Sequence, residues 1–198
     1  MQDDLLDPMP QHIAALRYST QPVWIFAYGS LIWDPEFSSI DTEAALLRGY
    51  HRSLCLYSYD YRGSPTRPGL VLGLDRGGSC WGVVFCLPSG AIERVWEREM
   101  SGRRVYEMRL LSVRTRQVTR KALTFTVSRN CPDYAGRVEL DEAARMILYA
   151  KGRRGTCREY FHNTLRHLDQ LGLVDRPLRR LAQRIEALAV LEKAHGYL

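Results

Sequence analysis

Residues 24–33 read Trp-Ile-Phe-Ala-Tyr-Gly-Ser-Leu-Ile-Trp, and the rest of the chain is interpreted around this stretch. Val23 to Phe26 are apolar and favour β-structure, so we expect a buried strand. The strand leads into a turn of small residues, where Gly29 permits the close approach of a ligand and successive N–H groups can bind an anion. The alternative is a strand and turn that only fill a core, since Gly-Ser commonly ends strands.

The composition is that of a globular protein with a domain of ordinary size. Of the 198 residues, 45% are hydrophobic and 25% are charged, which is enough apolar material for a core. No apolar run approaches the roughly 18 to 20 residues of a membrane span, and the N-terminus is acidic where a signal peptide is basic. We therefore expect a cytoplasmic protein.

Cysteine and histidine spacing indicates neither a disulfide framework nor a metal site. The five cysteines are odd in number and scattered, without a Cys-x-x-Cys pair, which is typical of buried thiols in a reducing compartment. The five histidines also lack metal-ligand spacing. We expect no metal and no cofactor.

The formal net charge of +6 permits two interpretations of the partner. Basic residues gather in residues 103–129 and 151–158, as on a nucleic-acid-binding face, but no motif of a known nucleic-acid-binding fold accompanies them. A basic surface that attracts a small anionic substrate explains the charge equally well. We expect no nucleic-acid or membrane partner, and the sequence does not indicate an oligomeric state.

Strand patterns come first along the chain and helical patterns last, an order that argues against a doubly wound parallel sheet. We expect residues 1–20 to form a loosely attached extension and residues 21–198 to form a single domain. The predicted elements of that domain, after the first strand, are a short helix from Asp41 to Gly49, a strand over 50–59, a loop over 60–69, strands over 71–74 and 80–87 joined by a hairpin at 75–78, a helix over 90–101, strands over 105–115 and 123–128, and three helices from Leu140 onward.

Glu99 is the most informative single residue. On the predicted helix over 90–101 one face is apolar, formed by Ala91, Ile92, Val95 and Trp96, and the opposite side carries Arg94, Glu97 and Arg98. Glu99 follows Val95 by four residues and Trp96 by three, so it lies on the apolar face. A carboxylate there is costly unless it is hydrogen-bonded or protonated.

Two interpretations of Glu99 remain open at this point. It could be a helix-end glutamate that turns to solvent or pairs with an arginine such as Arg103. It could also be a general base whose pKa is raised toward neutrality by its apolar neighbours.

Several segments, in order, resemble the ChaC branch of the γ-glutamylcyclotransferase superfamily. They are residues 26–33, 62–69, 81–85, 98–100 with Tyr106, 130–136 and 152–160. The resemblance runs from about Val23 to Leu168. It departs at Ala27, where the family usually has glycine, and at Cys131, which interrupts an Asn-Pro-Asp-Tyr segment.

The resemblance implies an α+β fold, a small closed mixed β-barrel with helices packed outside it. It also implies a lyase that converts glutathione to 5-oxoproline and cysteinylglycine, with Glu99 as general acid and base. The substrate-binding residues would be Ala27, Tyr28, Gly29, Ser30, Leu31 and Ile32, with Tyr106 and Tyr134 as candidates that core packing explains nearly as well. The alternatives are an enzyme for another γ-glutamyl amide, a non-catalytic γ-glutamyl-binding module and a basic nucleic-acid binder.

Overall fold

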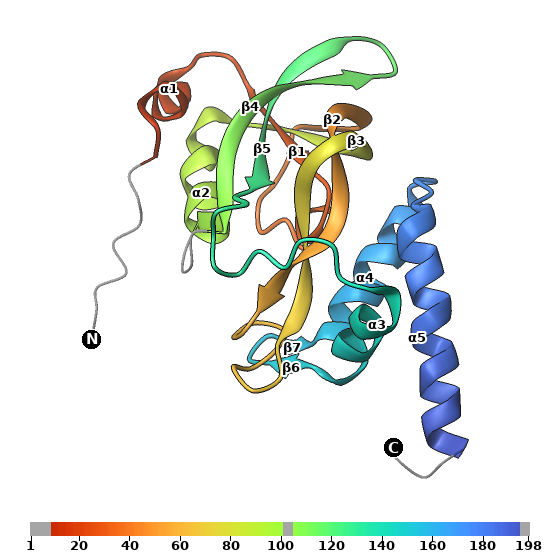
Figure 1. Ribbon diagram of the computed structural model, residues 1–198. Coiled ribbons are helices and arrows are strands. Elements are labelled where there is room, and N and C mark those ends of the chain that lie inside the picture. Colours follow the sequence, from red (N-terminus) through yellow and green to blue (C-terminus); the bar gives the residue numbers. More distant parts are fainter. Residues whose placement is uncertain (1–8, 101–104, 195–198) are drawn as a thin grey trace, which may run out of the picture. The chain divides into compact units, whose positions relative to one another are not determined.

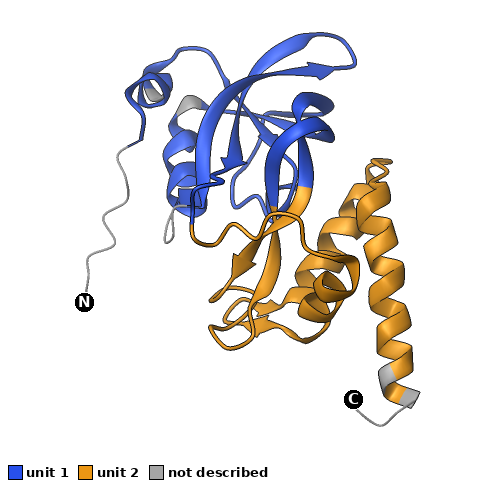
Figure 2. Cartoon of the chain, viewed as in Figure 1, with its two compact units in different colours: residues 1–52, 73–131 blue, residues 53–72, 132–198 orange. Residues whose placement is uncertain are grey.

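The computed structural model describes residues 9–100 and 105–194, and the chain divides into two compact units (Figures 1 and 2). Unit 1 comprises residues 1–52 and 73–131, and unit 2 comprises residues 53–72 and 132–198. Each unit is therefore built from two separate stretches of sequence. The single domain expected over residues 21–198 stays a prediction.

The strands form a closed barrel in the order β1-β3-β2-β4-β5. The bounds are β1 Val23–Ala27, β2 Asp41–Ser58, β3 Gly69–Leu87, β4 Tyr106–Thr115 and β5 Thr119–Val127. β1 is antiparallel to β3 and parallel to β5, and β4 is antiparallel to both β2 and β5. Together with the helices, this mixed, closed barrel confirms the predicted fold class.

β1 forms because its residues are buried and bonded on both edges. Ile25 and Phe26 have no exposed surface, and the strand pairs with β3 from Val23–Leu87 to Ala27–Val83. On the other edge, the hydroxyl of Thr124 donates a hydrogen bond of 2.9 Å to the carbonyl oxygen of Phe26. The barrel therefore fixes the point from which the following turn begins.

The helix predicted from Asp41 to Gly49 is wrong, because these residues open the long strand β2. Ala45, Leu46 and Leu47 pair with residues 113–115 of β4, and all three are buried. Pairing in the barrel overrides the weak helical preference of this short segment. Gly49 has a φ of +85°, and the strand continues past it instead of ending there.

The hairpin predicted at residues 75–78 is also wrong. β3 is one strand through this segment, and Gly77 and Gly78 adopt φ values of +100° and +68° within it. The neighbouring strand β2 contacts β3 at these glycines. Nδ1 of His51 in β2 lies 3.1 Å from the carbonyl oxygen of Gly77. The two glycines thus allow a local irregularity without reversing the chain.

Most of the remaining elements agree with the predictions, although β5 begins at Thr119, four residues before the predicted start at Leu123. Residues 60–68 form a loop, the strands at 105–115 and 123–128 are β4 and β5, and the helix predicted over 90–101 is observed as η3 Ser89–Ala91 followed by α2 Ile92–Met100. Its predicted end at Ser101 lies outside the described residues. The helices of unit 2 are α3 Leu140–Tyr149, α4 Cys157–Gln170 and α5 Arg176–Ala194, which contact one another. A two-stranded ladder, β6 Lys151–Gly152 with β7 Gly155–Thr156, connects α3 to α4.

The start of the described chain packs on unit 1. Residues 11–18 form α1 Gln11–Ala14 and η1 Ala15–Tyr18, with Ile13 fully buried. η1 contacts both α2 and η3. This part of the expected extension is therefore in contact with unit 1.

None of the helices described is both long enough and apolar enough to span a bilayer.

Candidate active site

The turn after β1 folds into a short helix, η2 Ser30–Ile32. The amide of Ile32 donates to the carbonyl of Gly29, and those of Trp33 and Asp34 donate to the carbonyl of Ser30. Among the described residues, no acceptor pairs with the N–H groups of Gly29, Ser30 and Leu31. These are the first N–H groups of the turn, and such groups suit an anion. The φ of Gly29 is −133°, so a positive φ is not what requires glycine here.

Arg52 anchors this turn, and the sequence patterns did not single it out. Its side chain projects from β2 and is 8% exposed. Its Nε donates to the carbonyl oxygen of Tyr28 at 2.5 Å, and its Nη2 donates to that of Trp81 at 2.7 Å. A buried arginine bonded to two main-chain carbonyls ties the residue that follows β1 to the interior of β3 and places a positive charge beside the turn.

Gly82 of β3 allows the end of β1 to approach closely. A Cβ atom at this position would lie 2.3 Å from the carbonyl oxygen of Ala27 and 2.7 Å from the ring of Phe26. No side chain fits at that distance. Gly82 is in a segment that carries the family resemblance, and the structure gives the steric reason for its residue type.

The predicted apolar face of α2 is confirmed. Ile92, Val95 and Trp96 are buried, and the Glu99 side chain is only 15% exposed. Its Oε1 lies 3.1 Å from Nε of Arg98. Glu99 is thus a largely buried carboxylate in an ion pair with its sequence neighbour Arg98. Arg103, the example of a partner given in the sequence analysis, lies outside the described residues.

The expectation that Arg98 lies on the exposed side of α2 is wrong, since its side chain is only 9% exposed. The segment after η2 covers it. Arg98 donates to the carbonyl oxygen of Asp34, and its guanidinium lies 3.8 Å from the Asp34 carboxylate and 4.0 Å from that of Glu36. One guanidinium therefore joins Glu99 to the chain that continues directly from the turn.

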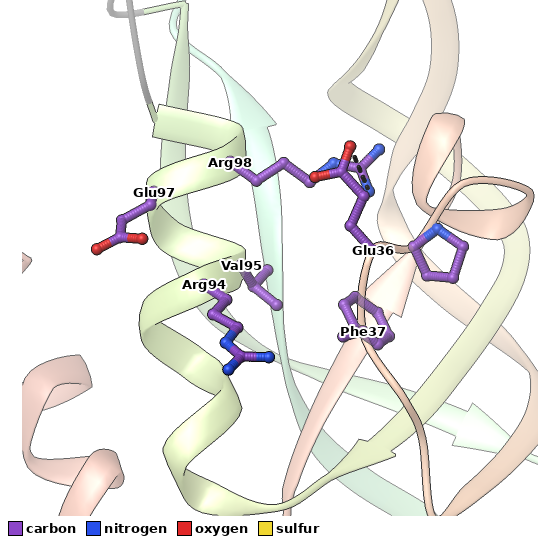
Figure 3. A pocket seen from close by; sticks show the side chains of 7 residues that line it. Glu36, Phe37, Arg94, Val95, Glu97 and Arg98 are labelled. Atoms are coloured by element: carbon purple, nitrogen blue, oxygen red, sulfur yellow. Dashed lines mark ion pairs between the residues drawn. The ribbon is translucent and has the colours of Figure 1, made fainter.

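A pocket of about 340 Å³ opens beside this contact (Figure 3). Its lining comes from α2 and from the segment after η2, namely Pro35, Glu36, Phe37, Arg94, Val95, Glu97 and Arg98. Figure 3 shows Arg98 reaching across to Glu36, whereas the side chain of Glu97 points away from them. The volume is within the range of small-molecule sites.

The two tyrosines lie in different units. Tyr106, at the start of β4, pairs with Val127, and its ring meets that of Phe125 edge-on at 6.5 Å. Tyr134, in unit 2, forms an isolated bridge with Leu56, and the following residue, Ala135, donates to the carbonyl of Cys55. Their part in substrate binding stays a prediction.

No cysteine forms a disulfide, and all five lie within the described part of the chain. Four are buried and Cys131 is half-buried. Burial raises the pKa of Cys157 to about 11, and its thiol donates to the carbonyl of Leu70 at 3.1 Å, so it is protonated at neutral pH. Across residues 9–100 and 105–194, no three His, Cys, Asp or Glu side chains gather as metal ligands.

The comparison with protein families decides the assignment. The model of the family described as ChaC-like protein matches residues 23–188. This chain belongs to the ChaC-like family. The matched range contains Glu99, the 27–32 turn and both tyrosines, and it extends into α5, beyond the Leu168 limit of the sequence resemblance.

Similar proteins carry consistent descriptions. The chain is 32% identical over 179 residues to the glutathione-specific gamma-glutamylcyclotransferase of Escherichia coli (strain K12). The aligned region covers 88% of this chain and 77% of that protein. It is 30% identical to human glutathione-specific gamma-glutamylcyclotransferase 1, over 71% of this chain and 67% of that one.

Solved structures agree on the fold of this ChaC-like chain. A yeast γ-glutamyl cyclotransferase specific to glutathione superposes with a TM-score of 0.77 at 19% identity, covering 85% of this chain and 97% of that one. At that identity the likeness shows the fold alone.

Proposed function

We propose that the chain is a cytoplasmic γ-glutamylcyclotransferase that cleaves glutathione into 5-oxoproline and cysteinylglycine. The observation that carries the proposal is the largely buried Glu99 carboxylate, which Arg98 ties to the segment following the 27–32 turn. Membership of the ChaC-like family and the glutathione-specific relatives support the choice of substrate. Five free cysteines support a reducing compartment.

The reaction needs a base and an oxyanion holder. The α-amine of the substrate attacks its own γ-carbonyl carbon, the new C–N bond closes a five-membered ring, and the bond to the cysteine nitrogen breaks. The nucleophile is already part of the substrate, so its attack is intramolecular and the entropic cost is low. The α-ammonium group first loses one proton to solvent, which gives the nucleophilic amine. As that amine attacks, Glu99 takes a second proton from the same nitrogen and transfers it to the leaving nitrogen. The carboxylate therefore ends the cycle as it began.

The 27–32 turn supplies N–H donors for negative charge. The N–H groups of Gly29, Ser30 and Leu31 bind either the substrate α-carboxylate or the oxyanion of the tetrahedral intermediate. Arg52 bonds to the Tyr28 carbonyl, which belongs to the same peptide group as the Gly29 N–H, and so strengthens that donor.

The test is a product assay with purified protein and glutathione. We expect 5-oxoproline and cysteinylglycine in equal amounts. Parallel reactions with γ-glutamyl amino acids measure the substrate range, and faster turnover of these would reassign the substrate within the same reaction class. If none of the γ-glutamyl compounds is cleaved, the chain is not a cyclotransferase.

A further inference from the structure

Arg98 is shared among three carboxylates. Its Nε lies 3.1 Å from Glu99, its Nη2 lies 3.8 Å from the Asp34 carboxylate, and its Nη1 lies 4.0 Å from that of Glu36. Three negative charges thus surround one positive charge. A guanidinium shared in this way neutralises Glu99 less completely than one that Glu99 held alone.

The three pairs differ in shielding from solvent. The side chains of Arg98 and Glu99 are 9% and 15% exposed, whereas those of Asp34 and Glu36 are 47% and 49% exposed. Water and salt screen the outer pairs more than the inner one. The inner pair therefore dominates, and the outer carboxylates modulate it.

The backbone at Glu36 supports a specific role for this side chain. Its φ of +56° places it in the left-handed region, and it is the one non-glycine residue in the described chain with a positive φ. Residues other than glycine adopt this conformation at a cost, and such outliers gather at functional sites. Figure 3 shows the Glu36 carboxylate meeting the Arg98 guanidinium.

We propose that Arg98 is a positioning residue that orients the Glu99 carboxylate, and that Asp34 and Glu36 tune the basicity of Glu99 by sharing Arg98 with it. The inference rests on the proposed role of Glu99 as the base. A neighbouring cation lowers the proton affinity of a carboxylate, and further carboxylates beside that cation act in the opposite direction.

Among the described residues, the other charged side chains beside the cluster come from α2 itself. Arg94 and Glu97 of α2 line the same pocket. Of the elements that pack against α2, η3 carries no titratable side chain, and among the described side chains of η1 the titratable one is the exposed Tyr18. Arg94 and Glu97 are exposed and of opposite sign. Glu93 is also exposed on α2 and is not among the residues that line the pocket, so Glu93→Gln is the matched control.

The experiment follows kcat/KM for glutathione against pH in the wild type and three variants. The position of the acid limb of this profile reports the pKa of the essential base in the free enzyme. Arg98→Gln removes the stabilising cation and moves the limb to higher pH by about one unit or more. Glu36→Gln removes one of the carboxylates that share Arg98, so the guanidinium stabilises the charged form of Glu99 more strongly. The acid limb then moves to lower pH by about half a unit, and this shift becomes smaller at high salt. Glu93→Gln leaves the limb in place.

A direct titration separates this inference from the proposed function. Carboxyl carbon NMR of the wild type, Glu36→Gln and Arg98→Gln reports the Glu99 titration without any turnover, with Glu99→Gln used to assign its signal. Opposite shifts in the two variants support the shared guanidinium even if glutathione is not the substrate. Shifts of the same sign, or no shift in Glu36→Gln at low salt, would overturn it.

Discussion

Glu99 departs from the usual place of a glutamate on a surface helix. It lies on the side of α2 that carries the buried Val95 and Trp96, where its charge needs a partner, and Arg98 supplies one. An ion pair with a sequence neighbour holds the carboxylate in place. A buried, oriented carboxylate is what the proposed proton transfers require.

Glu99→Gln keeps the size of the side chain and removes the base. We expect a folded protein that still binds glutathione and whose kcat falls on the order of a hundredfold or more. The measurement is 5-oxoproline release, with circular dichroism for the fold. Glu93→Gln, at an exposed position of the same helix outside the pocket lining, should retain full activity. Unchanged turnover in Glu99→Gln would end the assignment of this residue.

Arg52→Met removes the guanidinium that anchors Tyr28 and Trp81. We expect kcat/KM for glutathione to fall by about tenfold or more, because the turn loses its anchor and its positive charge. Arg52→Lys keeps the charge and should recover part of the loss. Arg48→Gln, an exposed arginine on the same strand, is the control. Equal kcat/KM in Arg52→Met and the wild type would show that the turn holds its shape unaided.

The sequence predicts Glu99 better than it predicts the residues around it. The periodicity of α2 is local, so a carboxylate on its apolar side is visible in the sequence. The burial of Arg98 is not visible, because Asp34, which covers it, lies more than sixty residues earlier. Arg52 was missed for the same reason, since both of its carbonyl partners are distant in sequence.

At the scale of elements, the strands were harder to predict than the helices. The helices of unit 2 follow from 3.6-residue periodicity, and all were found. The start of β2 and the middle of β3 were misassigned, because their extended conformation depends on neighbours in the barrel and not on local preference. Gly49, Gly77 and Gly78 were interpreted as the end of a helix and the turn of a hairpin, whereas the strands pass through these residues with a positive φ.

Gly82→Ala tests the close pairing of β1 with β3. The new Cβ would meet the Ala27 carbonyl at 2.3 Å, so the strands must separate. We expect a loss of about 1–3 kcal/mol in the free energy of unfolding, measured by urea denaturation. Gly90→Ala is the control, because beyond its chain neighbours no described atom lies within 4 Å of the place its methyl group would take. Equal stability of Gly82→Ala and the wild type would mean that β1 and β3 adjust at no cost.

The contact between α4 and α5 includes a histidine sensitive to pH. Burial lowers the pKa of His162, and Glu186, 3.4 Å away, partly opposes this effect. The unfolded chain therefore binds a proton at His162 more readily than the folded chain does, and stability falls as the pH drops below about 7. We expect His162→Gln to lose less stability than the wild type between about pH 7.5 and 5.5, measured as the change in Tm. An equal change in both proteins would contradict this.

At the scale of the whole molecule, the net charge of +6 bears on how an anionic substrate arrives. Glutathione is an anion at neutral pH, so the protein attracts it at a distance. We expect kcat/KM to fall several-fold as salt rises from about 20 to about 300 mM, while kcat changes little. Initial rates at subsaturating glutathione measure kcat/KM, and initial rates at saturating glutathione measure kcat. A kcat/KM that does not change with salt would show that the positive charge has no part in capture.

The interleaved sequence of the two units has a consequence for the inheritance of the gene. Residues 53–72 belong to unit 2 but lie between the two stretches of unit 1, and β2 and β3 each begin in one unit and end in the other. No single crossover between related genes can exchange one whole unit for another. A hybrid made by one recombination event therefore takes the residues of at least one unit from two different parents, and those residues did not evolve side by side.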